Sequence, residues 1–197
     1  MANANTPYGL RPYRHRNGAH YNGAATRYFV PASDATALFI GDPVIIAGSA
    51  DANGVATVTR ATAAGGNYLL GSVVAVDTDD GTGTGNTLGR DSPTYRAAST
   101  ARYVWVADDP DLVFLIQSNG STAAADVGLN VDLVAGTGST VTGLSAFQAA
   151  DSTKATTATL QLRILGFAQT VDNEVGNANA KLLVSINLHT LRNATGI

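Results

Sequence analysis

The chain has 197 residues, of which 45% are hydrophobic and 14% are charged, and its net charge is −3. This composition argues against an intrinsically disordered chain, because burial of so much apolar surface can offset the entropy lost on ordering. The absence of cysteine excludes disulfides, thiolate metal sites and a cysteine nucleophile. Long helices usually carry Lys and Glu on their solvent-exposed faces, and this chain has only two lysines and one glutamate. The composition therefore favours β-structure.

The first 27 residues form a basic segment. They carry four arginines and no acidic residue, so this segment has a charge of +4 and a net charge of −3 leaves −7 on the rest. The segment is rich in Asn and Gly, carries regularly placed tyrosines and lacks the apolar period of a helix or strand. A frayed terminus is one interpretation. We favour an extended basic arm over 1–27 that becomes ordered on a partner, because Tyr and Arg are enriched at interfaces. The predicted partner-binding residues are Tyr8, Arg11, Tyr13, Arg14, Arg16, Tyr21 and Arg27.

From residue 26 onward, short β-branched and aromatic runs alternate with turn residues. Six such runs predict strands over 27–30, 43–47, 55–60, 68–76, 102–107 and 112–117. Three later runs, at 129–133, 160–164 and 184–188, alternate apolar and polar residues, which indicates strands with one buried face. The pattern predicts an all-β fold, an antiparallel β-sandwich or β-barrel, with an extended N-terminal arm and long loops.

The domain organisation is predicted from composition changes along the chain. We expect a β body over 28–192 and a C-terminal tail over 193–197. The glycine-rich stretch 78–101 is either a long surface loop or a junction between two β lobes, and we favour one continuous body with that loop projecting. The Thr- and Ser-rich stretch 136–159 is expected to be a second exposed excursion. Loops of this length commonly contact a partner.

The chain offers no motif for catalysis. We find no phosphate-binding loop and no nucleophile elbow, and the three histidines are scattered. We therefore predict that the protein is not an enzyme and has no catalytic residues, no cofactor and no metal site. Asp77, Asp79 and Asp80 could supply oxygens to calcium, but their spacing departs from a calcium-binding loop and an acidic turn fits better.

An opening stretch, an early apolar run and two runs near the end carry a family resemblance. They are MANANTPYGLRP at 1–12, FIGDPV at 39–44, TTATLQLRI at 156–164 and DNEVGNANAKLLV at 172–184. Together they are similar to the accessory head proteins of tailed bacteriophages, the cement or decoration class. The resemblance implies a capsid decoration (cement) protein with an antiparallel β-barrel or jelly-roll-like sandwich body, made in the host cytoplasm. Such a protein binds the outside of the phage head, bridges neighbouring capsomers and stabilises the shell. The resemblance also implies the major capsid protein and neighbouring copies, in a homotrimer, as partners; the family offers no catalytic residue.

Other functions were weighed against this one. Another head, neck or tail structural protein of the virion shares the same features. A carbohydrate- or host-binding β-sandwich module would use Trp105, Tyr103 and Tyr95 for stacking. Nucleic-acid binding through the first arginines is disfavoured, because a body with a charge of −7 repels phosphate. We expect no membrane partner, since no apolar run reaches 18 residues.

Overall fold

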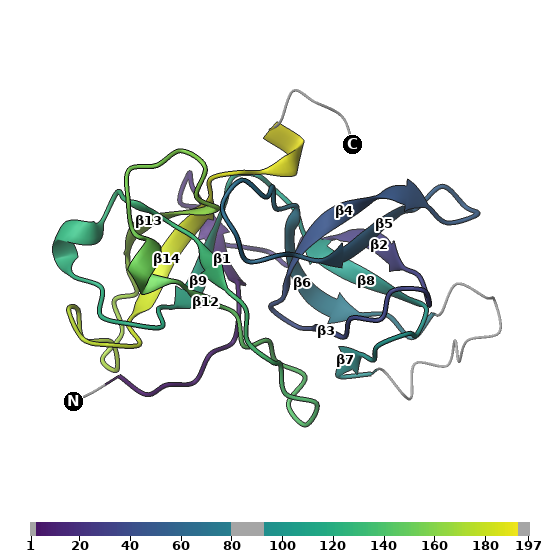
Figure 1. Cartoon of the computed structure of the whole chain (residues 1–197), viewed down its shortest axis with the longest axis horizontal. Helices are drawn as coiled ribbons and strands as arrows, with labels where there is room; N and C mark the ends of the chain where they lie inside the picture. The colour runs from purple at the N-terminus through teal and green to yellow at the C-terminus, as the bar shows by residue number, and fades with distance from the viewer. Residues whose placement is uncertain (1–2, 80–92, 193–197) are drawn as a thin grey trace.

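The computed structural model describes residues 3–79 and 93–192, which form two β lobes side by side (Figure 1). The predicted all-β class is confirmed: the sheets are mainly antiparallel, and one lobe is a closed barrel. The regular helical segments of the described residues are three short 3₁₀ turns: Ala124–Asp126 (η1), Asp151–Thr153 (η2) and Thr190–Arg192 (η3). No helix in the described ranges is long and apolar enough to cross a membrane.

The first lobe is a five-stranded barrel in the order β2-β5-β4-β6-β8. Its strands are β2 (Thr26–Val30), β4 (Pro43–Ala50), β5 (Ala56–Arg60), β6 (Gly71–Val76) and β8 (Arg102–Ala107). All pairs are antiparallel except β2 with β5. Valines from every strand fill the interior, together with Tyr28, Leu38 and Leu70. A two-stranded ribbon of β3 (Leu38–Phe39) and β7 (Tyr95–Arg96) accompanies the barrel.

The second lobe is a five-stranded sheet in the order β1-β9-β14-β13-β10. Its strands are β1 (Arg11–His15), β9 (Leu112–Gln117), β10 (Asn130–Val131), β13 (Leu162–Phe167) and β14 (Lys181–Ile186). The predicted alternation holds where it was clearest, because Leu162 and Ile164 are fully buried while Arg163 between them is exposed. The lobe has its own core, which includes Phe114, Ile116 and Phe147.

The extended arm predicted over 1–27 is not confirmed, because the described part of this segment is built into both lobes. β1 pairs with β9 in antiparallel register, with Arg11 opposite Leu115 and His15 opposite Leu112. Leu10 is fully buried in the core of the sheet lobe. At the other end of the segment, Arg27 lies within β2 of the barrel. A polar strand at a sheet edge contributes mainly backbone hydrogen bonds, so it needs no apolar period.

The barrel is inserted in sequence between two neighbouring strands of the sheet lobe. The chain leaves β1, completes the barrel up to β8, and returns through the turn 108–111 to β9. Within the stretch 78–101, which we considered as a junction, residues 80–92 lie outside the described residues. The later part of that stretch packs on the barrel side, where β7 pairs with β3. The predicted tail 193–197 also lies outside the described residues.

The stretch 136–159 is more tightly packed than the exposed excursion we expected. It contains β12 (Gln148–Ala149), which pairs with β11 (Leu133–Val134), and the turn η2. Phe147 is fully buried, and the guanidinium of Arg60 lies 4.6 Å from the centroid of its ring. This stretch therefore connects the sheet lobe to the barrel, while its tip remains exposed, with Val141 at 87% exposure.

Candidate docking site at the N-terminal hairpin

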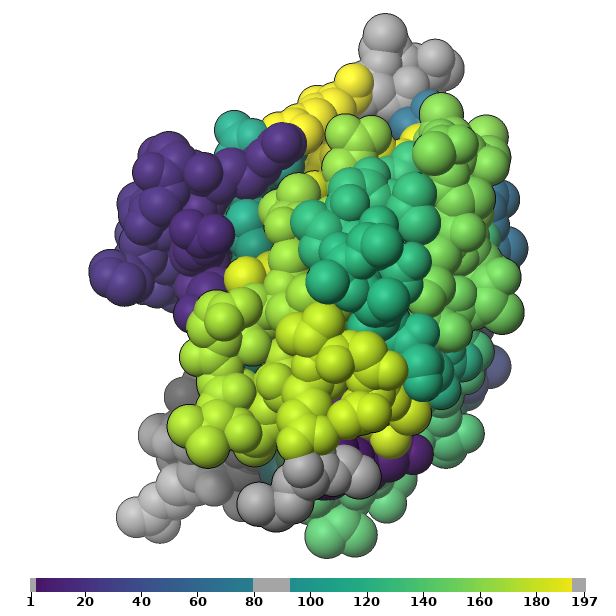
Figure 2. Space-filling view, turned by 90° about the vertical axis from the view of Figure 1, so that its left-hand side faces the viewer, coloured from purple at the N-terminus to yellow at the C-terminus, as the bar shows by residue number. Residues whose placement is uncertain are grey.

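β1 continues into a tight turn that brings the chain back at residue 20. The N–H of His15 donates to the carbonyl of Ala19 at 2.9 Å, and Arg14 bridges to His20 in antiparallel fashion. We call residues 11–20 the N-terminal hairpin. In the space-filling view, the purple N-terminal segment stands out beside the green and yellow surface of the sheet lobe (Figure 2).

The N-terminal hairpin carries three free positive charges. Arg11, Arg14 and Arg16 are exposed, and their guanidinium groups make no ion pair or hydrogen bond with the described part of the chain. Tyr13 belongs to the same strand as Arg11 and Arg14 and is 53% exposed. These four predicted residues are therefore brought together on one exposed element, where nothing within the described chain uses their side chains.

Backbone and side-chain contacts hold the N-terminal hairpin in place. The N–H of Arg16 donates to the carbonyl of Asp111 at 2.8 Å, and Nδ1 of His15 lies 3.2 Å from a carboxylate oxygen of Asp109. Both partners belong to the turn 108–111 between the lobes. The exposed arginines are thus presented on an ordered element, which lowers the entropy lost when they bind a partner.

A pocket of about 680 Å³ opens beside the N-terminal hairpin. Its walls come from the N-terminal segment, the barrel and the exposed tip of 136–159, and they include Tyr8, Leu10, Arg11, Ile40, Val73 and Leu144. The volume is in the range of pockets that bind small molecules. Three predicted site residues line this pocket: Tyr8, Arg11 and Tyr21.

The two tyrosines of the pocket are partly buried and have different roles. The hydroxyl of Tyr8 is buried and has no hydrogen-bond partner in the described structure, and burial raises its pKa. Tyr21 packs against the core of the sheet lobe, and its hydroxyl donates to the carbonyl of Ala24 at 3.0 Å. Tyr21 therefore stabilises the segment that leads from the hairpin into the barrel, whereas the hydroxyl of Tyr8 makes no hydrogen bond within the described chain.

Arg27 differs from the exposed arginines of the N-terminal hairpin, because its guanidinium is engaged by other side chains of the barrel. Its Nε lies 3.2 Å from a carboxylate oxygen of Asp77, and its Nη2 lies 2.7 Å from one of Asp79. Its guanidinium also lies 3.6 Å from the ring centroid of Tyr103. Because two carboxylates and an aromatic face already engage this cation, Arg27 is a structural residue of the barrel surface.

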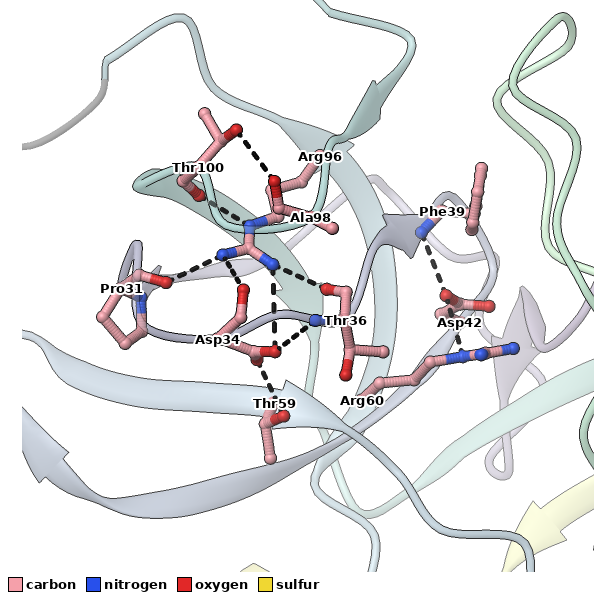
Figure 3. A network of polar contacts seen from close by, with 10 residues as sticks. All are labelled: Pro31, Asp34, Thr36, Phe39, Asp42, Thr59, Arg60, Arg96, Ala98 and Thr100. Atoms are coloured by element: carbon pink, nitrogen blue, oxygen red, sulfur yellow. Dashed lines mark hydrogen bonds and ion pairs between the residues drawn. The ribbon is translucent and has the colours of Figure 1, made fainter.

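A buried turn shapes the barrel side of the pocket. The N–H of Phe39 donates to Oδ2 of Asp42 at 3.0 Å, and the N–H of Asp42 donates back to the carbonyl of Phe39 at 3.0 Å. Burial raises the pKa of the Asp42 carboxyl, although Arg60, whose Nε lies 3.4 Å away, opposes the increase (Figure 3). The turn between Phe39 and Asp42 presents Ile40 to the pocket.

A second polar network is centred on Arg96, a fully buried arginine next to the barrel. The guanidinium of Arg96 donates to four backbone carbonyls at 2.6–2.8 Å (Figure 3). The acceptors belong to Pro31, Asp34, Thr36 and Thr100. Sequence reasoning missed this residue, because carbonyl acceptors leave no side-chain signature. The network fixes the segment between β2 and β3, and its role is structural.

Aromatic residues considered for sugar stacking are largely used within the fold. Tyr103 is 3% exposed and lies beneath Arg27. Tyr95 stacks on Phe39, with ring centroids 5.0 Å apart and an interplanar angle of 12°. Trp105 is partly buried in β8. Two of the three rings are thus engaged by intramolecular contacts, which does not favour an aromatic platform for a sugar.

The acidic residues considered for calcium have a cationic partner instead. Asp77 and Asp79 both bind Arg27, while Asp80 lies outside the described residues. Across residues 3–79 and 93–192, no group of three or more His, Asp or Glu side chains is placed to hold a metal ion. The geometry around Arg27 is that of a surface ion-pair cluster.

Several residues of the pocket were not predicted from the sequence. Ile40 stands in the run 39–44, which we used only for the family resemblance, and Leu144 lies in a stretch that we treated as an exposed excursion. A weak signal existed for each: Gly41 and Asp42 interrupt the first run, and Leu144 is an isolated large apolar residue among Thr, Ser and Gly.

Comparison of the chain with protein-family models, curated proteins and solved structures gives no match.

Proposed function

We propose that this chain is a non-enzymatic structural protein of a virion, a capsid decoration protein that docks on the outside of the phage head. The observation that carries the proposal is the N-terminal hairpin. It carries three exposed arginines with no partner in the described structure, Arg11, Arg14 and Arg16, and the exposed Tyr13. Arginine and tyrosine are the residue types that most often dominate the energy of protein interfaces.

The protection of sheet edges supports docking through side chains. The outer side of β1 is partly covered by residues 19–20, and β10 at the opposite edge of the sheet lobe is bridged by Ala155. The barrel has no open edge, because it is closed. Protected edges prevent uncontrolled strand addition, so a partner would be recognised by the exposed side chains of the hairpin.

The proposed partners are the major capsid protein and neighbouring copies of this chain in a homotrimer. An anionic patch on the shell would complement the free arginines, and several copies joined in one assembly would bind more tightly than each copy alone. A compact protein with two packed cores and an ordered binding element suits this role. A structural place elsewhere in the head, neck or tail is the alternative that the same surface would serve.

Cosedimentation with heads tests the proposal. Heads assembled without this protein are mixed with purified protein and separated on a sucrose gradient. We expect saturable binding and heads that resist heating better than undecorated heads. Absence of binding to heads, or binding restricted to isolated tails, would contradict the proposal.

A further inference from the structure

Two residues of the N-terminal hairpin, Arg11 and Pro12, also line the pocket, and the charge of Arg11 restricts what the pocket can accept. Arg11 lines the pocket, yet its guanidinium has no ion-pair partner in the described structure. Asp172 is close enough for its charge to raise the pKa of the neighbouring Tyr8, but its carboxylate is ion-paired to Lys181 and not to Arg11. The positive charge at the pocket wall is therefore left for a ligand.

The remaining walls of the pocket are mostly apolar. The accessible apolar side chains of the lining are those of Ile40 and Val74, which are partly buried, and Leu144, which is 41% exposed. Leu10 and Val73 also border the pocket, but their side chains are buried in the two cores. A nucleic-acid backbone would satisfy the arginine but would leave these apolar walls in contact with phosphate and sugar. An apolar side chain beside a carboxylate satisfies both features, since each part meets its complement.

The pocket is held open by backbone pairing. The N–H of Ile40 donates to the carbonyl of Gly143 at 2.9 Å, and the N–H of Ser145 donates to the carbonyl of Ile40 at 2.8 Å. On the other side, the N–H of Leu10 donates to the carbonyl of Gly41 at 2.8 Å. Three chain segments are thus fixed to one another around the pocket, so little ordering is needed when a ligand enters.

We infer that this pocket accepts an extended segment of the protein on which the chain docks, with an aliphatic side chain inside the pocket and an Asp or Glu carboxylate on Arg11. This inference rests on the proposed docking function and adds the chemistry of the recognised segment. Arg14 and Arg16 extend the positive surface beyond the pocket, so further acidic residues of the same segment would strengthen binding.

Photo-crosslinking on the head identifies the occupant. A benzophenone amino acid is placed at Leu144 and, as a matched control on the same exposed tip, at Val141, which is 87% exposed. Both proteins are bound to heads, irradiated and digested, and the cross-linked peptides are sequenced by mass spectrometry. We expect cross-links from position 144 to one capsid peptide that has an acidic residue within about two positions of an aliphatic one.

Substitutions in the same binding assay supply the second readout. Leu144→Asp and Arg11→Glu should each weaken binding to heads by about tenfold, whereas Val141→Asp should change it by less than about twofold. A charge reversal of the acidic residue in the cross-linked capsid peptide should restore binding by the Arg11→Glu protein.

The outcomes separate this inference from the proposed function. If the wild-type chain binds heads but position 144 gives no cross-link, or a peptide without an acidic residue, the inference is wrong and the proposed function stands. If the wild-type chain does not bind heads, the proposed function fails. If a single-stranded oligonucleotide competes with heads for the wild-type chain and Arg11→Glu removes that competition, a nucleic acid is the ligand and the inference is overturned.

Discussion

Gly9 and Gly41 lie against each other where the N-terminal segment crosses the barrel. A Cβ atom on Gly9 would stand 2.1 Å from the carbonyl oxygen of Gly41, and one on Gly41 would stand 2.2 Å from the carbonyl oxygen of Tyr8. Both residues have positive φ values, +74° and +93°. This contact between two distant parts of the sequence fixes Tyr8 and Leu10 beside the barrel and so forms one side of the pocket.

Substitution of Gly9 by alanine should destabilise the protein strongly. A positive φ costs alanine about 1–2 kcal/mol, and overpacking against the backbone of Gly41 adds about 1–3 kcal/mol. Gly18→Ala is the matched control, because Gly18 has φ +91° but no atom within 4 Å of its Cβ position. Urea unfolding should give a clearly larger loss for Gly9→Ala than for Gly18→Ala; equal losses would contradict the close contact.

Replacement of Arg96 by leucine should remove one of the main supports of the barrel. The four carbonyls that it binds would be left without their donor in a buried site, with an expected cost of about 3–5 kcal/mol in the free energy of unfolding. Arg14→Leu provides the comparison, since Arg14 is exposed and its side chain has no partner in the described structure. Chemical denaturation of both variants measures the difference. Ordinary surface substitutions change the free energy of unfolding by about ±0.5 kcal/mol. A loss of that size for Arg96→Leu would show that water can replace the guanidinium, and it would contradict the structural role of Arg96.

His189 should make the protein less stable in acid. It is 2% exposed, and burial, assisted by the charge of Arg192, lowers its pKa from 6.5 to about 4. Between these two pH values the unfolded chain binds a proton that the native protein does not, so stability falls as the pH falls. The contribution of this group amounts to about 3 kcal/mol between pH 7 and pH 4.

The variant His189→Asn tests this assignment, because an asparagine oxygen can accept the hydrogen bond that Nδ1 now accepts from the N–H of Leu191. The free energy of unfolding of His189→Asn should depend less on pH between 7 and 4 than that of the wild-type protein. Parallel curves for wild type and His189→Asn would contradict the role of this group.

The three free arginines should control docking without controlling stability. Replacing Arg11, Arg14 and Arg16 together by glutamine should weaken binding to heads by at least about tenfold, because the complementary charge of the partner loses its cations. The melting temperature should stay within a few degrees of the wild-type value, since these side chains have no partner in the described structure. Binding by the wild-type protein should also decline with salt, but less steeply than phosphate binding would. Unchanged affinity of the triple variant would exclude the hairpin as the docking element.

Truncation is not a usable test of the N-terminal segment. Removal of residues 1–27 would delete β1, the buried Leu10 and the beginning of β2. A truncated protein that fails to bind would then report lost folding rather than lost contacts, because an edge strand and a fully buried leucine are part of the sheet lobe. Point substitutions on the exposed face avoid this difficulty.

The strands with strong local patterns could be predicted from the sequence, and those without could not. Leu162 and Ile164 alternate with polar neighbours, so their strand was readable from the run 160–164. The pairing of β1 with β9 joins segments about one hundred residues apart, and β1 has no buried side chain to mark it. Its residues read as a flexible arm because backbone pairing, not side-chain burial, places it in the sheet.

The candidate site was predictable in type but not in arrangement. Clustered arginine and tyrosine singled out Arg11, Tyr13, Arg14 and Arg16, which are exposed in the structure; their role in binding stays a prediction. Arg27 has the same composition around it, but Asp77 and Asp79, fifty residues away in sequence, take its charge. The apolar half of the pocket depends on Ile40 and Leu144 meeting across the two lobes. Long-range pairing of this kind has no local sequence signal.

An image reconstruction of purified virions tests the central claim most directly. The account predicts density for the two β lobes on the outer surface of the head, with the N-terminal hairpin facing the major capsid protein. Density for this chain inside the head, in the tail alone, or on the head with the hairpin pointing away from the shell would contradict it.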